Sequence, residues 1–127
     1  MNRLLKIKLL IVRTVLTALV LVATSLSALA VEDASTEDVI LLAECGGFFN
    51  TYGSLVGRTD LSNTGNRLAA KVLGRAQDPV SLAISYERGS EFAGNWHDAD
   101  ERAVVVDYIQ MCSRVVSRNI DYLKAAT

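Results

Sequence analysis

The two cysteines of the sequence, Cys45 and Cys112, are the residues whose chemistry is most directly indicated. Each lies in a stretch whose apolar residues recur every three or four positions, which is typical of the buried face of a helix. They lack the C-x-x-C spacing of redox pairs, and a zinc site would need more ligands than two distant cysteines and one histidine provide. We therefore expect a structural Cys45–Cys112 disulfide, which closes a loop of about 68 residues and stabilises the fold by about 4 kcal/mol.

A second group of polar residues surrounds Trp96, but its spacing does not indicate catalysis. His97 has no serine, cysteine or paired acid at a distance that would make it a general base. The acids Asp98, Asp100 and Glu101 follow it, and acids near a helix start interact favourably with the helix dipole without any further role. No phosphate loop, dinucleotide fingerprint, haem-attachment motif or EF-hand loop is present. We therefore expect a non-enzymatic protein with no catalytic residue, no cofactor and no metal ion.

The first 30 residues have the three regions of a secretory signal peptide. Four cations and no acid precede position 14, an apolar run covers 14–24, and the segment ends with Ala28 and Ala30, whose small side chains suit a signal peptidase. We expect cleavage after Ala30, which would leave residues 31–127 as one helical domain. The alternative is an uncleaved membrane anchor, and Arg13 argues against it because a cation is costly within the hydrocarbon. Either reading places the domain outside the cytoplasm, in the periplasm or secreted.

Composition limits the function classes further. The sequence is 50% hydrophobic with a single proline, which excludes a disordered or proline-rich chain. Four of its 13 basic residues lie in the first 30 positions, so residues 31–127 contain 9 basic and 14 acidic side chains, a net charge of −5. Nucleic-acid binding draws on clustered Lys and Arg, and this acidic domain is therefore not expected to bind nucleic acid.

The apolar period predicts helices and no strand, and together they give an all-α, small four-helix bundle-like domain whose first and last helices are joined by the disulfide. Residues 94–97 are assigned to a connection. The third helix is expected to bury Val80, Ala83, Ile84 and Phe92. The expected helices, with the residue that caps each one where the sequence suggests it, cover Thr36–Gly57 after Ser35, Asn66–Ala76, Pro79–Phe92 after Asp78, and Ala99–Ala125 after Asp98.

Small residues form a second stripe along the first helix, beside the face that contains Cys45. Glycine inside a helix costs up to about 1 kcal/mol relative to alanine, so several of them require a compensation, which close approach of another backbone would provide. That backbone belongs either to a neighbouring helix of the same chain or to a partner protein. Trp96 likewise either closes one end of the core or marks a partner surface. The candidate partner contacts are Gly46, Asn50, Gly53, Gly57 and Trp96.

These observations predict a small exported protein that binds another protein, such as an inhibitor or an immunity-type factor, with a homo-oligomer left open. One alternative is a pH-responsive periplasmic stress chaperone, because the net charge of −5 becomes positive as carboxylates protonate near about pH 4. Another alternative retains the N-terminal segment as an anchor, which would make the chain an accessory subunit of a membrane complex. Membrane contact is expected only in that last case.

Overall fold

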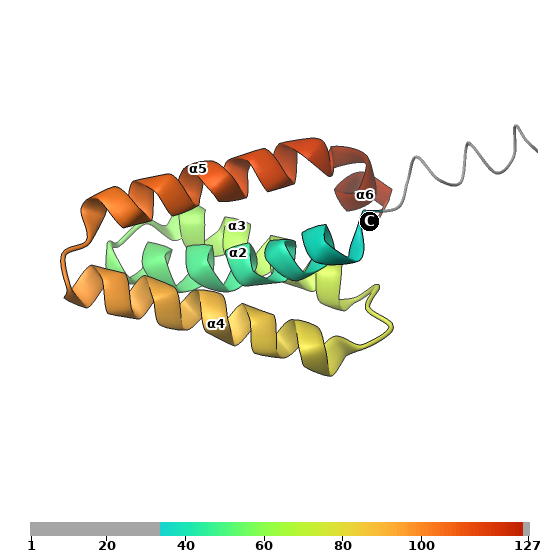
Figure 1. Cartoon of the computed structure of the whole chain (residues 1–127), viewed down its shortest axis with the longest axis horizontal. Helices are drawn as coiled ribbons and strands as arrows, with labels where there is room; N and C mark the ends of the chain where they lie inside the picture. The colour runs from blue at the N-terminus through green and yellow to red at the C-terminus, as the bar shows by residue number, and fades with distance from the viewer. Residues whose placement is uncertain (1–33, 126–127) are drawn as a thin grey trace, which may run out of the picture. The chain divides into compact units, whose positions relative to one another are not determined.

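A computed structural model describes residues 34–125, and within this range the chain is entirely helical apart from turns. The all-α, bundle-like prediction is therefore confirmed, whereas the signal peptide and its cleavage after Ala30 lie outside the described residues. Figure 1 shows α2 and α4 running in one direction and α3 and α5 in the other. The helices are α2 (Thr36–Leu55), α3 (Thr59–Leu73), α4 (Pro79–Asp98), α5 (Arg102–Arg118) and α6 (Ile120–Ala125).

Two helix starts follow the sequence pattern directly. The Ser35 hydroxyl accepts a hydrogen bond from the backbone N–H of Asp38 at 3.1 Å, and it caps α2. The Asp78 carboxylate accepts one from the backbone N–H of Ser81 at 3.2 Å, with Pro79 in the first turn of α4. Such side chains satisfy donors that have no partner within the helix. Both predicted caps are confirmed.

Other boundaries differ from the prediction. α3 begins at Thr59 rather than Asn66, although the intervening segment is rich in turn-forming residues. The Thr64 hydroxyl donates to the backbone carbonyl of Asp60 at 2.9 Å, and Gly65 is buried against α2. Packing against α2 thus keeps this segment helical although its residues favour turns. The last predicted helix is also divided in two, because Asn119 ends α5 before α6 begins.

The predicted connection at residues 94–97 is wrong, since α4 continues through it to Asp98. Trp96 stacks on Phe92 one turn earlier, with ring centroids 4.9 Å apart, which favours continuation of the helix. Asp98 consequently ends α4 and does not cap α5. The turn between the two helices contains Asp100 at a φ of 55°, and the backbone N–H of Glu101 donates to the carbonyl of Trp96 at 2.9 Å.

α2 is the central helix of the described part of the chain. Its residues 42–49 are all buried, so it has no solvent-exposed face along that stretch. A helix buried on all sides must be surrounded by its neighbours. α3, α4 and α5 are those neighbours, as Figure 1 shows for α4 and α5 on either side of α2. The buried face that the sequence predicts around Cys45 is therefore only part of the buried surface of this helix.

Glycines allow α3 and α4 to approach the backbone of α2 on two sides. A Cβ atom at Gly47 would fall on the carbonyl group of Tyr86 in α4, and one at Gly89 would fall on the carbonyl of Glu44 in α2. On the α3 side, a Cβ at Gly53 would lie 2.5 Å from the backbone nitrogen of Ser62. The close backbone approach that the glycine stripe predicts is thus found within the chain.

The buried face of α4 is not the predicted one. Val80 and Ile84 have exposed fractions of 68% and 55%, and Ala83 is exposed as well. The face that contacts α2 consists of smaller residues, because larger side chains would hold the two helices apart. Phe92 packs against the core from a half-buried position. The buried positions of α4 are Leu82, Ser85, Gly89 and Ala93.

Cys45 and Cys112 are both completely buried and lie at disulfide distance, with their Cα atoms 5.7 Å apart. The pairing joins α2 to the middle of α5, as the sequence predicts. A disulfide of this kind suggests a non-cytoplasmic environment, because cytosolic thiols are kept reduced. Among the described helices, none combines the length and the apolar character that crossing a membrane requires.

Candidate functional site

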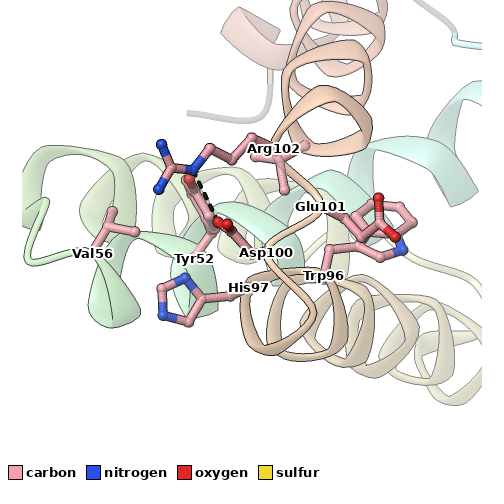
Figure 2. A pocket seen from close by; sticks show the side chains of 8 residues that line it. Tyr52, Val56, Trp96, His97, Asp100, Glu101 and Arg102 are labelled. Atoms are coloured by element: carbon pink, nitrogen blue, oxygen red, sulfur yellow. Dashed lines mark hydrogen bonds and ion pairs between the residues drawn. The ribbon is translucent and has the colours of Figure 1, made fainter.

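A pocket of about 280 Å³ lies at the end of the bundle where α2 and α4 end and α5 begins. Figure 2 shows side chains from all three of these regions around it. Apolar and aromatic groups, together with charged groups of the α4–α5 turn, form its lining. The lining residues are Tyr52, Val56, Trp96, His97, Asp100, Glu101, Arg102 and Val105.

Contacts with the core fix the two large aromatic rings of this pocket in place. Trp96 packs on Phe92 and on Tyr108, whose ring centroid is 5.2 Å away. Tyr52 stacks on Phe48 with centroids 5.5 Å apart and with nearly parallel rings. Aromatic pairs at such distances stabilise one another beyond the area they bury. The walls of the pocket are therefore aromatic rings that also pack against the core.

Carboxylates provide most of the charge around the pocket. The Arg102 Nε donates to the Asp100 Oδ1 at 2.9 Å, an exposed ion pair drawn as a dashed line in Figure 2. The carboxylate of Glu101 makes no ion pair or hydrogen bond within the described range. His97 lies edge-on to Tyr52, with ring centroids 6.4 Å apart. The lining thus has an excess of one negative charge when the imidazole is neutral.

The structure separates the predicted partner contacts into two groups. Gly46 and Gly53 are buried against α3, so their spacing is explained by packing within the chain. The Asn50 amide donates to the Tyr86 hydroxyl at 2.6 Å and its oxygen accepts from Ser62 at 2.8 Å, which assigns it to the same internal packing.

The other two predicted contacts lie at the pocket end of the bundle. Trp96 is half-buried and lines the pocket, and Gly57 is exposed beside Val56. Gly57 has a φ of 72°, which few residues other than glycine adopt without strain, so the turn after α2 explains this glycine. Contact of either residue with a partner stays a prediction.

One buried carboxylate, that of Glu44, was not predicted from the sequence. This residue of α2 is 8% exposed, and its side chain contacts α4 and α5. The Tyr108 hydroxyl donates to its Oε1 at 2.6 Å, and Arg88 Nη1 lies 3.7 Å from its Oε2. Burial and the bond to Glu44 raise the pKa of Tyr108 far above its ordinary range. The available signal was the position of Glu44 next to Cys45 within an otherwise apolar segment.

Substitution of Tyr108 by phenylalanine is expected to lower the free energy of unfolding by about 1–3 kcal/mol, because it removes the closest donor to a buried carboxylate. Urea unfolding at neutral pH measures this loss. Tyr86→Phe is the matched control, since its hydroxyl accepts a hydrogen bond from the neutral amide of Asn50. Equal losses in the two variants would contradict a special role for the Glu44–Tyr108 bond.

At the other end of the bundle, Asp38 joins the start of α2 to the end of α5. Its carboxylate accepts hydrogen bonds from Arg118 Nε at 2.9 Å and from Asn119 Nδ2 at 2.8 Å. These two bonds, the one from Arg118 first, lower the pKa of Asp38 from 3.8 to about 2. The arrangement therefore stabilises the end of α5 against the start of α2.

The Asp38 contribution to stability is expected to depend on pH. Because the pKa in the folded state, about 2, is below the ordinary value of 3.8, folding favours the ionised form. Asp38 contributes about 1–2 kcal/mol of stability at pH values above its ordinary pKa of 3.8. This contribution is lost as the pH falls through the folded-state pKa of about 2. Asp38→Asn should therefore be less stable than the unchanged protein near about pH 7, and the difference should shrink as the pH falls toward about 2, as measured by urea unfolding. Asp107→Asn, an exposed control on α5, should show no such convergence.

Among residues 34–125, no cluster of three or more His, Cys, Asp or Glu side chains is placed to hold a metal ion. Comparisons with protein-family models, with curated proteins and with solved structures find no match for this chain. The described residues form an all-helical bundle with a disulfide-linked cysteine pair and a pocket at one end.

Proposed function

We propose that this protein is an exported, non-enzymatic module that binds another protein, such as an inhibitor or an immunity-type factor, and that it does so through the pocket end of the bundle. Export is supported by the predicted signal peptide and by the cysteine pair. The absence of a catalytic arrangement in the sequence pattern around His97 supports a binding role. Periplasmic or secreted localisation is part of this proposal.

The pocket and its apolar border are the observation that carries the proposal. Leu55 and Val56, at the end of α2, have exposed fractions of 44% and 39%. Val56 also lines the pocket, so apolar surface and cavity are continuous. Interfaces typically combine an aromatic or apolar centre with a charged rim, and preorganised rings reduce the entropy lost on binding. Trp96 and Tyr52 provide the rings, and residues 98–102 provide the charges.

Site-specific photocrosslinking tests the proposal. A photoreactive residue at Val56 should form a defined crosslink in an extract of the compartment to which the protein is exported, and mass spectrometry identifies the linked protein. The same residue at the exposed Ala70 of α3 serves as the control and should give none. Excess unlabelled protein should compete, Ala70→Asp protein should compete equally well, and Val56→Asp protein should not. A crosslink at Ala70, competition by the Val56→Asp protein, or no crosslink at Val56 would overturn the proposal.

A pH-responsive chaperone is the second candidate, and the Asp38 contacts favour it. They weaken only as the pH falls toward about 2, so acid loosens one end of α5 while the disulfide retains its middle. Protonation of the other carboxylates reverses the net charge nearer about pH 4, before these contacts are lost. Light scattering of an aggregating client protein, with and without this protein, should show protection at low pH and none at neutral pH. Equal aggregation under all conditions would exclude this function.

An anchored accessory subunit remains as the third proposal. Intact mass of the exported protein distinguishes it from the first two, because cleavage after Ala30 removes the first 30 residues. A mass that retains them would support the anchor.

A further inference from the structure

The size of the end pocket indicates what kind of group it receives. At about 280 Å³ it is slightly smaller than the pockets that enclose drug-sized ligands or cofactors, which start at about 300 Å³. This volume has room for one long side chain. Since the proposed function already requires a protein partner, that side chain belongs most simply to the partner.

The walls of the pocket favour a side chain with an extended apolar stem. Val56 and Val105 contribute aliphatic surface, and Tyr52 and Trp96 contribute aromatic surface. The methylene groups of lysine and arginine pack along such surfaces while their charged ends stay near water. Arginine in particular is enriched among the residues that dominate binding energy at interfaces.

The charges at this end of the bundle favour a cation. The two arginines found there are already paired, Arg102 with Asp100 and Arg58 with Asp60, at N–O distances of 2.9 and 2.6 Å. The carboxylates of Asp98 and Glu101 make no ion pair or hydrogen bond with other described residues, and Glu101 lines the pocket. Helices both end and begin here, so their dipoles largely offset one another. The side-chain carboxylates therefore set a negative charge, which complements a cation.

We propose that the pocket receives a lysine or arginine side chain of a partner protein, with its stem against Val56, Val105 and the two rings and its charged head beside Glu101. This assignment rests on the proposed protein-binding function and names the chemistry that the partner must present. It also gives Glu101 a purpose beyond its position at the start of α5, where its side chain makes no capping hydrogen bond.

NMR titration of the exported, isotope-labelled protein with small probes tests this assignment. Acetyl-arginine methylamide should shift the indole N–H of Trp96 and the backbone amides of Val56 and Val105, with a dissociation constant of about 1–10 mM. Neutral acetyl-norleucine methylamide should bind at least about tenfold more weakly. Glu101→Gln should weaken binding of the arginine probe about fivefold or more, whereas Glu87→Gln, an exposed change on α4 outside the pocket, should leave it within about twofold. Thermal unfolding of both variants checks that the fold is retained.

Several results would overturn the assignment. Equal binding of the arginine and norleucine probes would remove the charge argument, and binding of free cadaverine without binding of the blocked arginine would indicate a site for free amines. No local shift with the arginine probe, together with a specific crosslink at Val56, would reject this pocket chemistry while the protein-binding function stands. Local shifts without any crosslink would support the pocket chemistry and reject the proposed function.

Discussion

An alanine at Gly47 is expected to lower the free energy of unfolding by about 3 kcal/mol or more, a large effect for adding one methyl group. The added Cβ would fall on the backbone carbonyl of Tyr86, which no side-chain rotation can move away. α2 and α4 would have to separate along their closest contact, and the core around Phe48 would lose its packing. Urea or thermal unfolding, followed by circular dichroism, measures the loss.

Gly94 provides the matched control for this prediction. It lies in the same helix pair, within α4, and a Cβ added there would meet nothing within 4 Å. Alanine at this position should therefore be neutral or stabilising by up to about 1 kcal/mol, since it improves helix propensity without a steric cost. If Gly47→Ala and Gly94→Ala had similar effects, the close backbone contact between α2 and α4 would be wrong.

Loss of the disulfide is expected to have an effect of similar size. Reduction, or Cys112→Ser, should lower the free energy of unfolding by about 2–5 kcal/mol, which is a large share of the stability of a domain this small. Both sulfur atoms lie in the core, so the serine variant additionally buries a hydroxyl group. Non-reducing mass spectrometry of the exported protein should show the oxidised mass and a linked pair of peptides that contain Cys45 and Cys112.

A variant without either cysteine is the control for reduction, because a reducing agent should leave its stability unchanged. The helices of the reduced protein are expected to persist in a looser, collapsed form, since their apolar surfaces remain. Far-ultraviolet circular dichroism retained while near-ultraviolet signals are lost would identify that state. Two free thiols in protein recovered from an oxidising compartment would contradict the pairing.

Local chemistry explains which parts of the fold the sequence predicted. Ser35 and Asp78 act as caps through hydrogen bonds within three residues, and the period around Cys45 and Cys112 places both cysteines in buried stripes. The face of α4 depends instead on what α2 can accept. The apolar period predicted that Val80 and Ile84 are buried, whereas the glycine-lined surface of α2 accepts small residues such as Gly89 and Ala93.

The candidate site was predictable only in part, for a related reason. Trp96 was expected to close one end of the core or to mark a partner surface, and the acids after it were assigned to a helix start. The pocket itself requires α4 to continue through residues 94–97 and the turn at Asp100 to follow it, and the sequence pattern assigned that segment to a connection. Glu44 was missed because periodicity treats a single acid in an apolar segment as exposed, whereas Tyr108 in a distant helix makes its burial favourable.

The burial of residues 42–49 of α2 on every side limits how this sequence can change during evolution. All eight positions from 42 to 49 are buried, so a substitution at any of them would disturb packing. Gly47 lies against the backbone of Tyr86 in α4 and Gly89 lies against the backbone of Glu44 in α2, so neither can acquire a side chain without a shift of the opposite helix. The outer faces of α3, α4 and α5 are free to diverge rapidly. A distant relative of this protein should therefore be recognisable by its paired cysteines and by glycines at these two contact points, even where the rest of its surface has become dissimilar.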